Sequence, residues 1–158
     1  MPTWIFQCNP EKFHIDDALR DPEVQAKGTW LAEQEGSRMA PGQEAYIYKT
    51  SPTMAIIAKV TILSEFKEMG PEDYMYKYWS DEMKKDDRLK KARPRVYFRV
   101  EEFAPNLDGI TRPELRELGI PHGLMGMTNI RLKYSTQVKS IQDAWSSIGA
   151  ISISESEG

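Results

Sequence analysis

The sequence predicts an α+β domain whose strands occupy the middle of the chain and whose helices are short. β-branched and aromatic residues fill short runs at residues 45–62 and 94–103, as they do in strands. Helix-forming patterns are brief and lie on either side of these runs. The chain has 158 residues, the size of one domain with its own core. We therefore expect one domain at residues 1–150, followed at 151–158 by a flexible tail or the start of a linker.

The first part of the chain predicts a strand, a helix and a long turn. Residues 3–8, with an apolar run at 4–6, predict a short strand that Asn9-Pro10 breaks. A short helix is expected at residues 14–20, ending before Pro22, because the residue that precedes a proline disfavours helical backbone angles. Residues 27–39 are polar and predict a turn that leads into a short helical segment.

The middle of the chain predicts a hairpin, a long connection and a further strand. Strands at 45–49 and 54–62 flank turn-forming residues at 50–53. Alternating apolar and polar residues at 94–103 indicate a half-buried strand. Residues 64–93 mix charges with aromatic rings and predict a connection that is long for a compact domain. Long loops of this kind often carry function.

The last part of the chain predicts a helix, a short strand and a longer helix. Thr111 and Glu114 have the spacing of a capping box and begin a helix that ends near Gly119. A strand is expected at residues 127–132. A helix is expected at residues 138–148, because its apolar residues share one face: Val138, Ile141, Trp145 and Ile148.

Charge and composition exclude several classes of protein. The formal net charge is −3, which argues against a uniformly basic, nonspecific nucleic-acid binder. Positive charge nevertheless concentrates at residues 84–99, which form either a solvated loop or an edge that contacts phosphate. No apolar run approaches the roughly 18 to 20 residues of a membrane span, and the first residues lack the pattern of a secretory signal. We therefore expect a cytoplasmic protein.

Potential metal ligands and nucleophiles are few. The chain has one cysteine and two histidines, which do not form a closely spaced ligand set. Cys8 ends an apolar run and is expected to pack as a small buried residue. A nucleophile formed by Cys8 with His14 or His122 is the weaker alternative. We expect no metal, no cofactor and no catalytic residue.

The four tryptophans divide into two pairs. Trp4 and Trp145 occupy apolar positions of a predicted strand and helix, and we expect both in the core. Trp30 and Trp79 lie in polar, turn-rich sequence instead. Rings in such a setting are typical of ligand sites, although packing of the long connection onto the sheet would also explain Trp79.

A series of short motifs resembles, in order and spacing, the EVE domain, a PUA-like family related to the YTH readers of methylated adenosine in RNA. The resemblance spans nearly the whole chain. The matching segments are Trp4-Ile5-Phe6, Thr29-Trp30 followed by Gln34 and Arg38, Pro41-Gly42 before Ala45-Tyr46-Ile47-Tyr48, Ala55-Ile56-Ile57-Ala58-Lys59-Val60, Tyr78-Trp79, Arg95-Val96, and Gly126-Met127-Thr128-Asn129-Ile130-Arg131-Leu132. EVE modules guide modification-dependent restriction systems, in which a separate nuclease domain cuts.

This resemblance implies a PUA-like mixed β-barrel of about five or six strands surrounded by short helices, with a pocket for a modified base flipped out of nucleic acid. Unstacking a base costs a few kcal/mol, and aromatic side chains return roughly 1 to 3 kcal/mol per stacked base. Trp30 and Trp79 are the expected walls. The other implied pocket residues are Tyr78, Gln34, Asn129, Thr128 and Ser51. The residues implied to contact the nucleic-acid backbone are Lys49, Lys84, Lys85, Lys90, Lys91, Arg93 and Arg131.

Several of these assignments have a purely structural alternative. Trp30 could close one end of the barrel, and Gln34 could cap a helix instead of reading a base edge. Asn129 could stabilise a turn, and turn chemistry explains Ser51 equally well.

The resemblance implies a non-enzymatic reader of a modified base in DNA. The base would be N6-methyladenine or a modified cytosine, such as 5-methylcytosine or 5-hydroxymethylcytosine. The expected partner is DNA in preference to RNA, and a fused or associated nuclease could do the cutting. The alternatives are a reader of modified RNA, which would contact the 2′-hydroxyl, and a small-molecule-binding protein. An enzyme would need converging titratable groups, for which the sequence offers no compelling pair.

Overall fold

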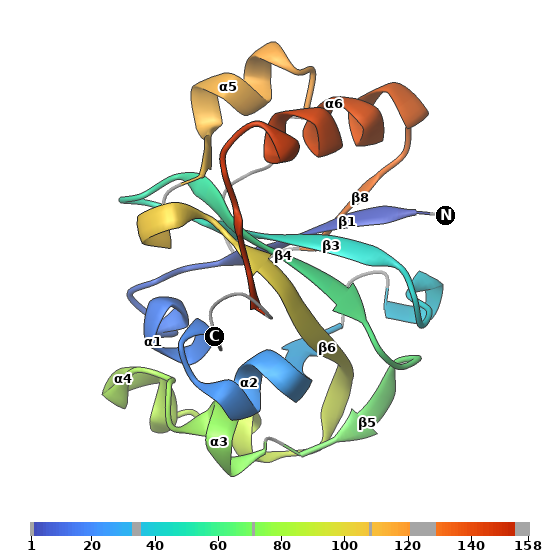
Figure 1. Ribbon diagram of the computed structural model, residues 1–158. Helices are drawn as coiled ribbons and strands as arrows, with labels where there is room; N and C mark the ends of the chain where they lie inside the picture. Colours follow the sequence, from blue (N-terminus) through green and yellow to red (C-terminus); the bar gives the residue numbers. More distant parts are fainter. Residues whose placement is uncertain (1, 33–35, 71, 108, 121–128, 154–158) are drawn as a thin grey trace.

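The computed structural model describes residues 2–32, 36–70, 72–107, 109–120 and 129–153 (Figure 1). Its strands form one mixed, curled sheet with the order β2-β6-β4-β3-β1-β8. In that order, β1 and β3 run parallel and the other neighbours run antiparallel. Three short strands pair at the margins, β5 and β9 with β6, and β7 with β4. The strands are β1 Thr3–Cys8, β2 Gly28–Leu31, β3 Glu44–Lys49, β4 Ala55–Ile62, β5 Lys67–Met69, β6 Arg93–Phe103, β7 Ile110–Thr111, β8 Ile130–Leu132 and β9 Ile151–Ser152.

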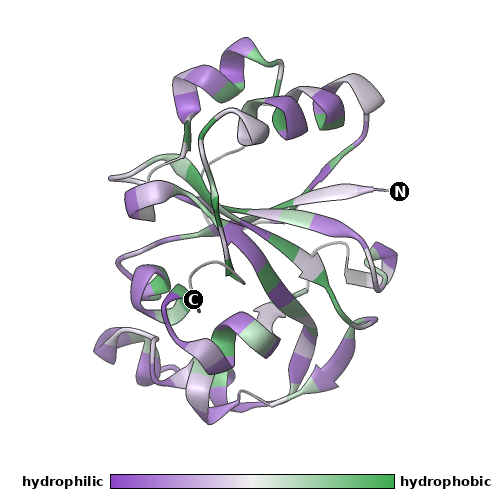
Figure 2. Cartoon of the chain, viewed as in Figure 1, coloured by the Kyte–Doolittle hydropathy of each residue, from purple (hydrophilic) through white to green (hydrophobic). Residues whose placement is uncertain are grey.

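Helices cover both faces of the sheet. In Figure 1, α5 and α6 lie on the upper face, whereas α1 to α4 lie on the lower face. Figure 2 shows hydrophilic and hydrophobic residues alternating along α6, as in an amphipathic helix. The helices are α1 Ile15–Leu19, α2 Pro22–Lys27, α3 Asp73–Tyr76, α4 Asp81–Lys84, α5 Arg112–Glu117 and α6 Ser135–Ser146, with 3-10 turns η1 Gly36–Arg38, η2 Asp87–Lys90 and η3 Pro105–Leu107.

The two faces bury separate hydrophobic cores. Successive side chains of a strand point to opposite faces, so Trp4 and Phe6 enter one core while Ile5 enters the other. We call the core on the α1 to α4 side, which contains Phe6, the first core, and the core under α5 and α6, which contains Trp145, the second core. Because β1, β3 and β4 are covered on both faces, their sequences are almost continuously apolar.

Most of the predicted elements are confirmed. The strand at 3–8 is β1, the helix at 14–20 is α1, the hairpin is β3 and β4, the alternating strand is β6, and the last helix is α6. Trp4 and Trp145 are 0% and 2% exposed, as expected of core residues. None of the described helices is long and apolar enough to span a membrane.

The helix at 14–20 ends before Pro22 as expected, but an unpredicted helix follows it, and the first part of the turn predicted at 27–39 is a strand. Pro22 begins α2 at a position where its missing N–H is not needed, and Asp21 caps this helix by accepting the Glu23 backbone N–H at 2.9 Å. The predicted turn at 27–39 starts instead with β2, which pairs with β6. Gly28 permits this close approach, since a Cβ there would lie 2.3 Å from the Phe98 ring. Trp30 is therefore a strand residue.

The expectation of a long loop at 64–93 is also wrong. The segment contains β5, α3, α4 and η2, which have at most four residues each and are too short to show a periodic pattern. Ser80 and Asp86 cap α4 and η2 by accepting the backbone N–H groups of Met83 and Arg88.

The sheet continues beyond residue 150, since β9 pairs with β6 as far as Ser152. The remainder of the expected tail, residues 154–158, lies outside the described residues.

Candidate functional site

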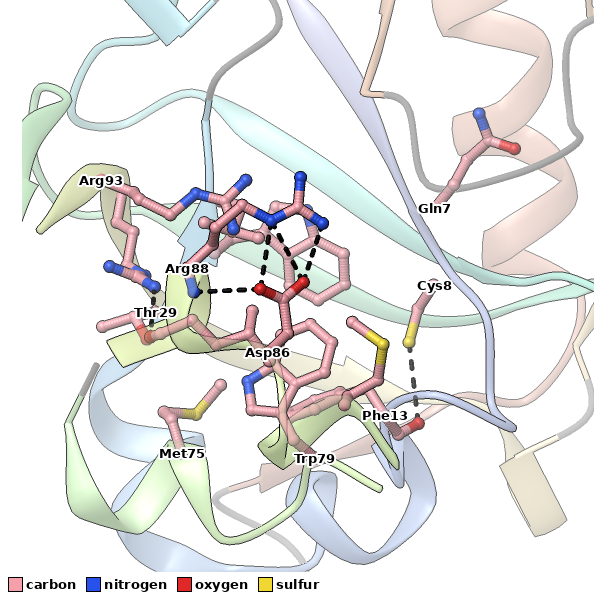
Figure 3. Close-up of a pocket in the computed structure, with 14 residues that line it drawn as sticks. Gln7, Cys8, Phe13, Thr29, Met75, Trp79, Asp86, Arg88 and Arg93 are labelled. Carbon is pink, nitrogen blue, oxygen red and sulfur yellow. Dashed lines mark hydrogen bonds and ion pairs between the residues drawn. The ribbon is translucent and has the colours of Figure 1, made fainter. Parts of the chain in front are cut away.

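A cavity of about 230 Å³ on the first-core side of the sheet contains both tryptophans that the sequence singled out (Figure 3). We call it the tryptophan pocket. Its lining combines aromatic and aliphatic side chains with one carboxylate and three arginines. The lining residues are Gln7, Cys8, Phe13, Thr29, Trp30, Leu31, Met75, Trp79, Met83, Asp86, Arg88, Leu89, Arg93 and Arg95.

Trp30 is held rigidly by its neighbours. Its ring stacks on Phe6 with centroids 5.1 Å apart and planes 13° apart, and it meets Phe98 edge-on at 6.2 Å. The indole Nε1 donates a hydrogen bond of 3.0 Å to Asn129 Oδ1. Asn129 is 4% exposed, and its Nδ2 donates to the Leu31 carbonyl at 2.9 Å. One face of the ring is thus used for packing, and the remaining surface is available to the pocket.

Trp79 follows α3 and forms a second aromatic wall. An isolated β-bridge joins it to Phe13, and the two rings contact each other with centroids 4.8 Å apart and planes inclined by 56°. Met75 of α3 also lines the pocket (Figure 3). These apolar groups come from the segment 64–93 and from the chain just after β1, so the wall depends on the docking of α3 against the sheet.

A carboxylate and a guanidinium lie together in the lining. Asp86 accepts from Arg88 at Nε (3.1 Å) and Nη2 (2.8 Å), in addition to the backbone N–H (Figure 3). These hydrogen bonds from Arg88 lower the pKa of Asp86 to about 2. Asp86 is therefore ionised at neutral pH and presents an acceptor beside two indoles.

Arg95 anchors the basic segment to the sheet. Its side chain is 4% exposed and donates to the carbonyls of Leu89 and Lys91, each at 3.3 Å, and of Met69. A buried guanidinium needs such acceptors. Arg95 thus fixes the turn that carries Arg88 and Arg93 next to the pocket.

Cys8 lines the pocket but has no features of a nucleophile. Its side chain is 1% exposed, and its Sγ lies 3.9 Å from the Phe13 carbonyl oxygen. Burial raises the pKa of the thiol well above its usual range, so the thiolate does not form near neutral pH. His14 is exposed, and His122 lies outside the described residues. Within the described ranges, no three His, Cys, Asp or Glu side chains lie close enough together to hold a metal ion.

No protein-family model matches the sequence, and no curated protein matches it. Several solved structures match the fold. Human THYN1, solved in complex with DNA containing 5-methylcytosine, superposes with a TM-score of 0.58 at 14% identity, over 90% of this chain and 96% of that chain. A Pseudomonas putida protein gives 0.58 at 13% identity, over 90% and 98%. ASCH from Zymomonas mobilis gives 0.53 at 12% identity, over 89% and 94%.

The chain shares the fold of these structures, in agreement with the architecture expected from the resemblance to PUA-like domains. Identities this low establish the architecture alone, so the residues of the site are judged by their geometry in this chain.

Within this fold, the tryptophan pocket brings together three of the residues proposed for the site from the sequence: Trp30, Trp79 and Arg93. Asn129 does not line the pocket; it holds Trp30 in place. Tyr78 does not line it either, because its hydroxyl donates to Asp21 Oδ2 at 2.6 Å, a bond that raises the pKa of Tyr78 to about 12.

The other proposed residues lie away from the pocket or outside the described ranges. Ser51 is exposed in the turn between β3 and β4, and the Lys49 ammonium is 2.9 Å from Asp16 Oδ1 in an ion pair. Arg131 lines a different hollow. Lys84, Lys85, Lys90 and Lys91 belong to the neighbouring helices and turn without lining the pocket. Gln34 and Thr128 lie outside the described residues.

Sequence reasoning missed several lining residues. Asp86 and Arg88 lie within the basic stretch at 84–99, but nothing in the pattern distinguishes them from solvated charges. The one available signal is the position of Asp86 two residues before Arg88, which suits a cap. Thr29 gives no signal in the sequence because β2 resembles a turn, and Met75 and Met83 give none because α3 and α4 are too short to recognise.

Proposed function

We propose that this chain binds DNA carrying a modified base and accommodates that base, flipped out of the duplex, in the tryptophan pocket. The observation that carries the proposal is the meeting of Trp30, Trp79 and an ionised Asp86 in one cavity. Aromatic faces recover the cost of unstacking, and fixed polar groups identify the base edge.

The size of the cavity supports a ligand group as small as one base. Pockets for drug-sized ligands measure roughly 300 to 1,000 Å³, whereas this one measures about 230 Å³. A single base fits that scale better than a whole nucleotide or a large metabolite. The sugar and phosphates would remain outside the cavity.

The polar groups favour bases that carry an exocyclic amino group. Carboxylates accept hydrogen bonds from cytosine N4, and the adenine N6 group is a donor of the same kind. Asp86 supplies such an acceptor, and Arg88 and Arg93 supply donors for a carbonyl or ring nitrogen. Met75 and Met83 offer polarisable apolar surface to an added methyl group. This chemistry supports modified cytosine or N6-methyladenine as the base.

The comparison with human THYN1, solved with DNA containing 5-methylcytosine, supports DNA as the partner. The chain would act by binding alone, and any cutting would belong to a nuclease in another domain or a partner protein.

The test is intrinsic tryptophan fluorescence titrated with short duplexes that are identical except for one base: cytosine, 5-methylcytosine, 5-hydroxymethylcytosine, adenine or N6-methyladenine. Each titration is run at low and physiological salt, with matching RNA and free nucleosides as competitors. We expect selective quenching by one modified duplex that persists at physiological salt. Equal, salt-sensitive quenching by all duplexes would contradict the proposal, and competition by free nucleoside alone would favour a small-molecule binder.

Variants localise the effect. Trp30→Ala should abolish the preference for the modified duplex while the circular dichroism spectrum stays folded. The matched control is Trp145→Phe, which removes a tryptophan from the second core and should keep the preference. A Trp30→Ala protein that is folded and still selective would exclude Trp30 from the pocket wall.

A further inference from the structure

A second hollow lies where β8 leads into α6, and its chemistry differs from that of the tryptophan pocket. It measures about 510 Å³, and we call it the β8 groove. Its lining includes Arg131, Lys133, Tyr134 and Lys139 and contains no acidic residue. In a chain of net charge −3, a hollow lined by three cations and no carboxylate is a local reversal of the overall charge.

The cationic side chains of the groove make few ion pairs and hydrogen bonds within the protein. Lys133 makes no ion pair with any described residue. Lys139 pairs with Asp143 at 2.9 Å, but both side chains are more than 65% exposed, so solvent screens the pair. The Arg131 Nε is buried and has no hydrogen-bond partner among the described residues. Lys133 and Lys139 are both exposed and can therefore pair with an external anion.

Tyr134 adds a contact group of a different kind. Among the described residues, it is one of two exposed large hydrophobic side chains, and 65% of its surface is accessible. Tyrosine is one of the side chains that contact phosphate and sugar in protein–DNA complexes. Its position between Lys133 and the first turn of α6 places the ring at the groove itself.

β8 connects the groove to the residue that holds Trp30. Asn129, which holds Trp30, immediately precedes β8, and Arg131 and Lys133 follow it at alternate positions. At about 3.3 Å per residue, these two side chains start roughly 7 and 13 Å from Asn129. One strand of DNA advances about 3.4 Å per nucleotide. About two to four nucleotides of one DNA strand would span the distance from Asn129 to these two side chains.

We propose that the β8 groove binds the phosphate backbone of the DNA strand that flanks the flipped base. This inference rests on the proposed function of the tryptophan pocket. The two sites would have different roles. Phosphate contacts in the β8 groove would supply affinity and register, and base contacts in the tryptophan pocket would supply selectivity. An acidic protein segment would also match the charge of the groove. Only a DNA strand, however, would link the groove to a base bound at Trp30.

The test compares two double variants that each remove two exposed cations. Lys133→Ala with Lys139→Ala alters the groove, and Arg99→Ala with Arg116→Ala is the control, since neither of these arginines lines a described cavity. Affinity for the preferred modified duplex and for its unmodified twin is measured over a range of salt concentrations. Each lost phosphate contact reduces the slope of log K against log salt by about 0.9.

We expect the groove variant to lose about 1 to 2 units of this slope and to bind both duplexes more weakly in the same proportion. The control should keep the wild-type slope. An unchanged slope in the groove variant, or an equal loss in the control, would overturn the proposal, including the case in which the groove binds an acidic protein instead. Failure of the pocket proposal has a different signature, which is a wild-type protein without preference between the two duplexes.

Discussion

The two faces of the sheet are covered in different ways. The second core lies beneath α6, a helix of 12 residues that buries Ile141 and Trp145. The first core lies beneath α1 to α4, none longer than six residues. Short helices gain little from their own hydrogen bonds and depend on caps and docking. The tryptophan pocket occurs on the face covered by these short helices. They pack against the sheet without filling all the space over it, and a cavity remains.

The largest expected effect tests the second core. Trp145→Ala should reduce the free energy of unfolding by about 3 to 5 kcal/mol, because it leaves a cavity under α6 and removes the indole N–H that donates to Glu102. Chemical denaturation measures this loss. The folded fraction should keep its preference for the modified duplex. A loss of preference in the folded protein would mean that packing of the second core is energetically coupled to the tryptophan pocket.

A smaller effect is expected where the first core meets the pocket. Asn129→Leu removes both the acceptor of the Trp30 indole and the donor to the Leu31 carbonyl. Leaving a buried polar group unsatisfied costs about 1 to 3 kcal/mol. Unlike Trp145→Ala, this change should also weaken base preference, because Trp30 loses its fixed orientation. The measurement pairs denaturation with duplex titration, and Asn129→Asp, which keeps the acceptor, should retain more of the preference.

The cap of α2 provides a test on the first-core side, outside the pocket. Asp21→Ala should cost about 0.5 to 2 kcal/mol in the free energy of unfolding, since it removes an N-cap, whereas Asp21→Asn keeps the cap and should cost less. Both variants should lower the pKa of Tyr78 from about 12 toward 10.0, because the bond to the Asp21 carboxylate is lost. NMR titration of the tyrosine ring measures this shift. An unchanged pKa would contradict the Tyr78–Asp21 hydrogen bond.

The same pair sets a pH dependence with a definite sign. The pKa of Tyr78 is raised on folding, so its contribution to stability is complete below pH 10.0 and is lost as the pH rises toward about 12. The pKa of Asp21 is lowered, chiefly by the bond from Tyr78, so its contribution is lost only as acid protonates the folded carboxylate. Wild type and Asp21→Asn should therefore converge in stability at both extremes of pH.

The smallest effect concerns the outer surface of α6. Lys139→Ala breaks an exposed ion pair four residues apart and should change the free energy of unfolding by only about 0.3 to 0.5 kcal/mol. Asp143→Ala, which breaks the same pair from the other side, should have a similar effect on stability. Only the lysine variant should weaken binding to DNA, if the β8 groove contacts phosphate. Equal effects on binding would assign the change to the pair itself.

Much of the sheet could be predicted, because its strands bury both faces or alternate regularly. The apolar runs at residues 4–6 of β1 and 55–58 of β4 and the alternation along β6 are direct consequences of burial. The apolar stripe of α6 likewise predicts a helix with one buried face. β2 could not be recognised, since its polar neighbours and Gly28 resemble a turn and only pairing with β6 makes it a strand.

The site could be predicted in part. Trp30 and Trp79 stood out because their local sequence gives no core pattern, and both line the pocket. Asp86 and Arg88 did not stand out, because their position depends on how a segment of very short helices docks onto the sheet. Tyr78 was paired with Trp79 by sequence adjacency, yet consecutive side chains diverge, and Tyr78 points toward Asp21. Distances between segments far apart in the chain are not encoded in any local pattern.

The contact between Asn129 and β2 has a consequence for self-association. β2 and β8 are the two ends of the strand order, and exposed edge strands are templates for pairing with other chains. The Asn129 Nδ2 donates to the Leu31 backbone carbonyl, and its Oδ1 accepts from the Trp30 indole N–H, so β2 and the start of β8 are joined to each other. The residue that orients the proposed base-binding wall thereby also shields an edge from addition of a foreign strand.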